Sequence, residues 1–229
     1  MFVVKIGGSL LFNEDEQINA KLISEYARTI RTVFTKQKEK FVIVVGGGKI
    51  ARRYITASRV LGGTETQNDI LGIEVAKLNA RLLIAALGNI ACPTIPNSFQ
   101  EFQAIYALTD KVIVCGGFTP GQSTNAVAAA IAEETNATKL INLTNVDGVF
   151  TDDPQKNSQA KLQQSIAISA FKTLLQNQKT SAGNYPLFDL TALQIVLRSK
   201  IPLVFANGNN PENLLKAIKG ENIGTEIKY

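Results

Sequence analysis

The sequence predicts an α/β fold in which helices pack on a mainly parallel sheet. Short apolar runs rich in Val, Ile and Phe alternate with longer amphipathic segments, which is the pattern of successive strand–helix units. Several of these runs pass directly into glycines. No stretch rich in Pro, Gly or Ser divides the 229 residues. We therefore expect one domain over residues 1–229.

Residue periodicity predicts the individual elements. The predicted strands are residues 2–6, 41–45, 111–115, 139–144 and 201–206. Apolar residues recur at helical spacing over 18–34, 66–87 and 189–197. The polar segment 151–164 has no such spacing and is expected to be an exposed loop.

Composition and charge exclude several classes of protein. Lys and Arg exceed Asp and Glu by five but are scattered along the chain, so no nucleic-acid partner is expected. No apolar run approaches the roughly 18 residues of a spanning helix, so no membrane partner is expected. The first residues contain a lysine and glycines within their apolar stretch, unlike a signal peptide. With only two cysteines, far apart, we expect a cytoplasmic protein.

The chain contains no histidine. Ser-His-Asp and Cys-His catalysis and the common zinc sites are therefore excluded. Lys, Arg, carboxylates, hydroxyls, backbone amides and oxygen-bound metal remain. This set suits phosphoryl transfer, which depends mainly on positioning and charge stabilisation.

Glycines or small polar residues follow each predicted strand. The runs VVKIGG, VIVVGGG and VIVCGG end in glycines, and LINLTNVDG and PLVFANG end in Asn, Asp and Gly. Parallel strands place such loops at one edge of the sheet, where ligands of open α/β folds bind. The row of loops predicts a long site with room for two ligands side by side.

The segment VVGGGKIARRYI combines three glycines with three cations. Glycine lets backbone N–H groups approach a phosphate, and a helix starting near Gly48 would add its positive N-terminal end. Lys49 would lie in its first turn, Arg52 would reach back over the loop, and Arg53 would be a surface charge. The alternative is a glycine turn that only connects strand to helix. Neither GxxxxGK[ST] nor GxGxxG is matched.

Motifs along nearly the whole chain resemble the amino-acid kinase superfamily and, within it, the archaeal type of UMP kinase. They are KIGGSL, VVGGGKIARRYI, TQNDILGI, LNARLLIAAL, GGFTPGQSTNAVAAAIAE, TNVDGVFTDDP, DLTALQIVLRSKIPL and KGENIGTEI. The resemblance implies an amino-acid-kinase-like three-layer fold, with UMP bound by about residues 1–135 and ATP by about 136–229. It also implies transfer of the ATP γ-phosphate to UMP in pyrimidine nucleotide (CTP) biosynthesis, Mg²⁺ carried by ATP without direct protein ligands, and a homohexamer.

The resemblance further implies site residues. The catalytic residues would be Lys5, Arg52, Asp147 and Asp189. ATP would be bound by Gly8, Ser9, Gly48, Arg52, Thr144, Asn145, Phe150 and Asp153. UMP would be bound by Gly47, Asp69, Phe118, Thr119, Pro120, Gly121, Gln122, Ser123 and Thr124.

Some of these residues also have purely structural interpretations. Asp69 and Asp189 could be helix N-caps, and Asp147 could belong to a turn. Lys5 could be a lysine that extends from the sheet edge to solvent. Asn125 occupies a place often held by aspartate in this superfamily. The functional alternatives are a kinase of the same superfamily with a carboxylate, carbamate or isopentenyl phosphate acceptor, or a non-catalytic storage oligomer resembling the molybdenum storage proteins.

Overall fold

A mixed sheet forms the centre of the protein. The computed structural model describes residues 1–37, 39–152, 157, 159–177 and 187–229. The strands are β1 (Phe2–Ile6), β2 (Phe41–Val45), β3 (Ile113–Cys115), β4 (Lys139–Thr144), β5 (Ser165–Ala167), β6 (Leu203–Asn207) and β7 (Gly224–Lys228). They lie in the order β3-β2-β1-β4-β6-β7-β5. The first five in this order are parallel and β7 is antiparallel to β6, which confirms the prediction of a mainly parallel sheet.

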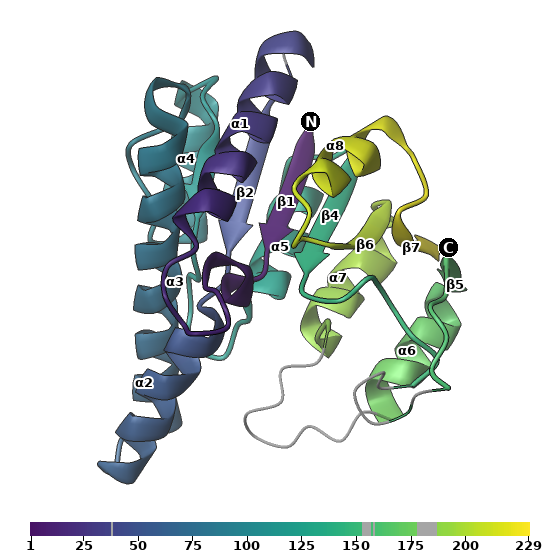
Figure 1. Cartoon of the computed structure of the whole chain (residues 1–229). Helices are drawn as coiled ribbons and strands as arrows, with labels where there is room; N and C mark the ends of the chain where they lie inside the picture. The colour runs from purple at the N-terminus through teal and green to yellow at the C-terminus, as the bar shows by residue number, and fades with distance from the viewer. Residues whose placement is uncertain (38, 153–156, 158, 178–186) are drawn as a thin grey trace.

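Helices cover both faces of the sheet and give the fold three layers (Figure 1). They are α1 (Ala20–Gln37), α2 (Gly48–Val60), α3 (Glu65–Leu87), α4 (Phe99–Leu108), α5 (Thr124–Glu134), α6 (Ile168–Asn177), α7 (Leu190–Ser199) and α8 (Glu212–Lys219), with short 3-10 helices η1 (Gly8–Leu11) and η2 (Gly88–Ile90). Ile30 of α1 and Leu83 of α3 belong to the core on one face. Phe171 of α6 and Val196 of α7 belong to the core on the other. The three-layer α/β fold is confirmed.

Strand β1 shows how the sequence produces this arrangement. Phe2, Val4 and Ile6 belong to the core beneath α1 and α3, whereas Val3 belongs to the core beneath α5 and α7. A strand buried on both faces needs apolar residues at successive positions. Alternation places Lys5 on the same face as Val3, at the carboxyl end of the strand.

The strand order reverses between β1 and β4. The chain proceeds from β1 through β2 to β3 on one side, and then from β4 to β6 on the other. In open α/β sheets this reversal leaves a crevice outside the carboxyl ends of the strands, where ligands bind. The fold therefore places a ligand site next to the ends of β1 and β4.

Two strands differ from their predicted bounds, and β6 differs at both ends, since it ends at Asn207 instead of residue 206. β3 begins at Ile113 instead of residue 111, because the Val112 N–H bonds to the Ile90 carbonyl in an isolated bridge region. β6 begins at Leu203 instead of residue 201, after Pro202, whose nitrogen carries no hydrogen for the ladder. The described part of the predicted loop 151–164 contains no helix.

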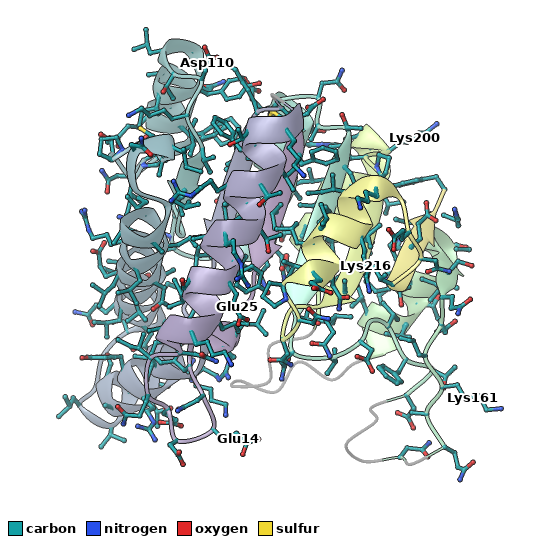
Figure 2. The ribbon with its side chains drawn as sticks, turned by 45° about the horizontal axis from the view of Figure 1, so that its top comes forward. Glu14, Glu25, Asp110, Lys161, Lys200 and Lys216 are labelled. Atoms are coloured by element: carbon teal, nitrogen blue, oxygen red, sulfur yellow. The ribbon has the colours of Figure 1, made fainter. Side chains whose placement is uncertain are left out.

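Charged side chains of both signs lie around the outside of the ribbon. Figure 2 shows Glu14 and Asp110 at separate edges of the molecule, and Lys161 and Lys200 at others. Within the part of the chain that the structure describes, no helix has the length and apolar character to span a membrane.

Candidate active site

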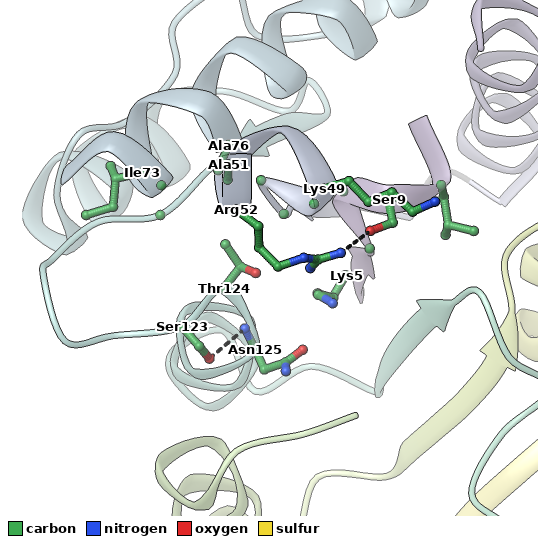
Figure 3. A pocket seen from close by; sticks show the side chains of 18 of the residues that line it. Lys5, Ser9, Lys49, Ala51, Arg52, Ile73, Ala76, Ser123, Thr124 and Asn125 are labelled. Atoms are coloured by element: carbon green, nitrogen blue, oxygen red, sulfur yellow. Dashed lines mark hydrogen bonds between the residues drawn. The ribbon is translucent and has the colours of Figure 1, made fainter. Parts of the chain in front are cut away.

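A cavity of about 500 Å³ lies at the carboxyl ends of β1, β2 and β4 (Figure 3). Its walls include the glycine loops after β1 and β2, the first turns of α2 and α5, and part of α3. Among the described residues that line it, Lys5, Lys49 and Arg52 are cations and Asp69 is a carboxylate. The size falls within the roughly 300–1,000 Å³ of ligand sites, and the excess of positive charge suits an anionic ligand.

The glycine loops after β1 and β2 touch each other. A Cβ on Gly8 would lie 2.1 Å from the Gly46 carbonyl oxygen and 2.4 Å from the Gly48 nitrogen. Gly48 has φ +66°, and a Cβ there would lie 2.4 Å from the Gly8 carbonyl carbon. These glycines are therefore required for the backbone loops to meet, in addition to any approach by phosphate.

Asn79 of α3 holds the glycine loop after β2 in place through its side-chain amide. Its side-chain amide is buried and donates to the carbonyls of Gly46, at 2.9 Å, and Gly47, at 3.3 Å. Helix α2 begins at Gly48, so its first N–H groups have no intrahelical acceptor. No sequence pattern indicates this role, because Asn79 lies within an apolar helical segment.

Lys5 is half-buried and its side chain lines the cavity. Burial lowers the pKa of its ammonium from the ordinary value to about 8, and the negative charge of Asp189 opposes this by raising it. The Lys5 side chain thus lines the cavity and is half-buried, whereas the structural interpretation required it to extend freely to solvent. Lys5 is therefore a partly desolvated cation in the wall of the cavity.

Arg52 reaches back over the loops, as the helical spacing predicts. Its Nη2 donates to the Ser9 hydroxyl at 3.4 Å and so connects α2 with η1 (Figure 3). Lys49 in the first turn also lines the cavity. Arg53 lies outside it and forms an ion pair with Glu16. The prediction that Arg53 is a surface charge is confirmed, although the side chain has a partner.

Asp69 is not an N-cap. Thr64 caps α3, with a capping box completed by Gln67, and Asp69 lies in the second turn. Its Oδ2 accepts the Gly121 N–H at 2.7 Å. Gly121 has φ +78° and follows Pro120 in a turn of the type II pattern, which favours Pro and Gly at these places. Asp69 thus holds the loop after β3 against α3 and also faces the cavity.

Asp189 is the N-cap of α7, because its Oδ1 accepts the Ala192 N–H at 2.9 Å. Its Oδ2 accepts a short hydrogen bond from the Ser123 hydroxyl. Ser123 in turn caps α5, accepting the N–H groups of Asn125 and Ala126. The structural interpretation of Asp189 is therefore correct, and its charge nevertheless acts on Lys5.

Asp147 is exposed in the loop after β4. The Asn207 side-chain amide, at the end of β6, donates to its Oδ1 at 2.8 Å. Asn207 is itself held by Asn213, which donates to its carbonyl oxygen, and by the Asn209 N–H, which bonds to its side-chain oxygen. The polar residues that follow β6 and β4 thus lie side by side, as expected for neighbouring parallel strands.

The cavity collects most of the predicted site residues but not all of them. The predicted residues that line it are Lys5, Gly8, Ser9, Gly47, Gly48, Arg52, Asp69, Gln122, Ser123, Thr124, Thr144 and Asn145. Those outside its lining are Phe118, Thr119, Pro120, Gly121, Asp147, Phe150 and Asp189. Asp153 lies outside the described residues. Lys49, which the sequence places in the first turn of α2, also lines the cavity, as do Asn125 and an apolar wall with Ile55, Ile73 and Ala76; none of these is among the predicted site residues.

Sequence and structure comparisons agree with this fold. Residues 1–207 match the family model described as the amino acid kinase family. The chain is 45% identical over 225 residues to the uridylate kinase of Methanobrevibacter smithii, covering 98% of this chain and 97% of that protein. It is similar to the crystal structure of uridylate kinase from Archaeoglobus fulgidus, with TM-score 0.85, 39% identity and 99% of each chain covered.

A more distant structure resembles the chain in fold alone. The UMP kinase from Ureaplasma parvum has TM-score 0.80 at 24% identity, covering 100% of this chain and 98% of that one. The family model spans most of the chain, and the Methanobrevibacter relative is covered almost completely. This chain belongs to the amino acid kinase family.

Proposed function

We propose that this protein is a UMP kinase, which transfers the γ-phosphate of ATP to UMP and forms ADP and UDP. The observation that carries the proposal is the meeting of two glycine loops, Lys5, Arg52 and the N-terminus of α2 around one cavity. This arrangement suits two phosphate groups brought close together. The similarity to archaeal uridylate kinases supports UMP as the acceptor.

The chain's own residues account for the chemistry. Two anionic phosphates repel each other, and the ammonium of Lys5 with the guanidinium of Arg52 offsets this repulsion as charge develops in the transition state. The UMP phosphate supplies its own attacking oxygen, so no general base is needed. The absence of histidine is therefore compatible with the reaction.

The two nucleotides would occupy different parts of the site. On the acceptor side we place Gly47, Asp69 and the loop 118–124, with the Asp69 carboxylate on the ribose hydroxyls. On the donor side we place Gly8, Ser9, Gly48 and Arg52, with Thr144, Asn145, Phe150 and Asp153 in and after the end of β4. The acceptor would thus be bound within residues 1–135, and the donor by residues 136–229 together with Gly8, Ser9, Gly48 and Arg52.

Magnesium would enter with ATP. Mg²⁺ prefers oxygen ligands and retains several waters, and the carboxylates of Asp147 and Asp189 near the carboxyl strand ends fit contacts to a hydrated ion. The ion would neutralise charge on the donor phosphates. Among the described residues, no group of three or more Asp, Glu and Cys side chains is arranged to hold a metal by itself.

Asp69→Asn should raise KM for UMP several-fold and leave KM for ATP nearly constant. The asparagine oxygen can still accept the Gly121 N–H, so the turn is kept while the negative charge on the ribose side is lost. Steady-state kinetics with each nucleotide varied in turn measures both constants. Glu74→Gln, an exposed position on the same helix, should change neither. Equal increases in both KM values would remove Asp69 from the acceptor site.

We expect kcat/KM for ATP to fall above about pH 8, because Lys5 loses its proton there. Among the described residues, the other charged side chains that line the cavity with Lys5 are Lys49, Arg52 and Asp69. The negative charge of Asp189 also acts on Lys5 and raises its pKa. Asp189→Asn removes the charge that raises the pKa of Lys5, so the basic limb should move to lower pH. If the basic limb of the pH profile stays in place or moves to higher pH in this variant, the charge of Asp189 does not raise the pKa of Lys5.

The alternative functions make different ligand predictions. Binding to the native state raises the melting temperature, so thermal shifts with UMP, CMP, acetylglutamate, aspartate and isopentenyl phosphate compare the acceptors directly. UMP should give the largest shift. A larger shift with a carboxylate acceptor or isopentenyl phosphate would favour another kinase of the family, and no shift with any of them would favour the storage oligomer.

A homohexamer in the cytoplasm, serving pyrimidine nucleotide synthesis, completes the proposal. Exposed apolar side chains near the α2–α3 connection support assembly, since Val60 is 83% and Leu61 86% exposed and such patches commonly mark interfaces. The two free, buried cysteines suit a reducing compartment. Light scattering of the purified protein measures the subunit number.

A further inference from the structure

The hydroxyl of Ser123 has no capacity left for a ligand. It accepts the N–H groups of Asn125, at 3.1 Å, and Ala126, at 3.0 Å. It donates its only hydrogen to Oδ2 of Asp189. A serine hydroxyl offers one donor and two acceptor lone pairs. All three are used within the protein, although Ser123 lines the cavity.

These bonds join the first turns of two helices, α5 and α7. Ser123 begins α5, and Asp189 begins α7, where it caps the Ala192 N–H. Both helices therefore present their positive N-terminal ends near the Asp189 carboxylate. The negative charge is close enough to act on Lys5 at the end of β1.

We propose that Ser123 is a positioning residue for Asp189, and that its hydroxyl holds the carboxylate beside Lys5 instead of binding the acceptor nucleotide. This inference rests on the proposed kinase function. Gln122 and the turn bonded to Asp69 directly precede Ser123. The acceptor loop is therefore connected through one hydroxyl to the group that sets the charge environment of Lys5.

Ser123→Ala tests this role against a matched control. Ser98 is also a serine N-cap, at the start of α4, where its hydroxyl accepts the Glu101 N–H at 3.1 Å, and it does not line the cavity. Loss of either cap should lower the melting temperature by a similar few degrees. Only Ser123→Ala should change catalysis.

We expect kcat of Ser123→Ala to fall about tenfold with KM for UMP within about twofold of wild type, the pattern of a lost transition-state contact. Ser123→Thr keeps both the hydroxyl and the cap and should restore kcat. Ser98→Ala should have normal kcat. A raised KM for UMP with normal kcat would mean that the hydroxyl binds the acceptor, and would overturn the proposal.

A double-mutant cycle with Asp189→Asn gives the sharper result. If Ser123 acts through Asp189, adding Ser123→Ala to Asp189→Asn should change kcat less than about twofold. A tenfold loss in both backgrounds would show independent roles and overturn the proposal.

Turnover of UMP by the wild-type enzyme is measured first and tests the proposed function separately. If the enzyme uses another acceptor, the same variants are compared with that acceptor. If it transfers no phosphate at all, both proposals fail. If the wild-type enzyme is active and the effects of Ser123→Ala and Asp189→Asn on kcat are additive, only the proposed role of Ser123 fails.

Discussion

Lys5→Met should lower kcat by about 10²–10³-fold, as the loss of one preorganised donor to transition-state charge does elsewhere. The variant nearly keeps the length of the side chain but removes the ammonium from the lining of the cavity. A coupled assay of ADP release measures the rate. Lys21→Met, at an exposed position on α1, should retain normal turnover. Near-normal kcat in folded Lys5→Met would exclude Lys5 from catalysis.

The same variant should melt at an equal or higher temperature at pH 7. Burial lowers the pKa of Lys5 to about 8, so the unfolded state binds this proton more tightly than the folded state. The charged lysine therefore costs stability below pH 8, and the cost declines as pH rises toward the unfolded pKa. Thermal melts of both proteins should converge between pH 8 and about 10. A variant that melts lower at pH 7 would contradict the assigned burial.

Gly8→Ala should reduce kcat by on the order of 10²-fold or more, because a displacement of about 1 Å at reacting groups has that effect. The added methyl would overlap the Gly46 carbonyl and the Gly48 nitrogen, and backbone cannot move aside without separating the loops. We also expect a destabilisation of about 1–3 kcal/mol from overpacking, measured by urea unfolding.

Gly62→Ala is the control for Gly8→Ala. Gly62 has φ +84° with nothing within 4 Å of the added Cβ, so this change introduces backbone strain without a clash. It should leave kcat unchanged. If Gly8→Ala were as active as Gly62→Ala, the contact between the two loops would not be needed for catalysis.

The sequence predicted the central strands well because their burial requires an unbroken apolar run. β1, β2 and β4 begin and end as predicted. β7 was missed, since only Thr225 and Ile227 alternate inward in a polar five-residue segment. Its position depends on pairing with β6, a contact distant in sequence that local periodicity does not record.

The sequence predicts those parts of the candidate site whose residues directly follow the strands. Glycines after β1 and β2, with Lys5 and Arg52 close to them in the sequence, indicate a site for anions. The partners that hold the site could not be predicted in this way. Asn79 behind the glycine loop and Asn207 beside Asp147 act through contacts that only the folded chain creates.

The most direct test of the central claim is phosphate transfer to UMP itself. Purified protein with ATP, Mg²⁺ and each acceptor in turn is followed by ADP release, and the products are identified by ³¹P NMR. The proposal predicts UDP and ADP in equal amounts, with the highest kcat/KM for UMP among UMP, CMP, acetylglutamate, aspartate and isopentenyl phosphate. ADP release that is faster with another acceptor, or that occurs without UDP, would contradict it.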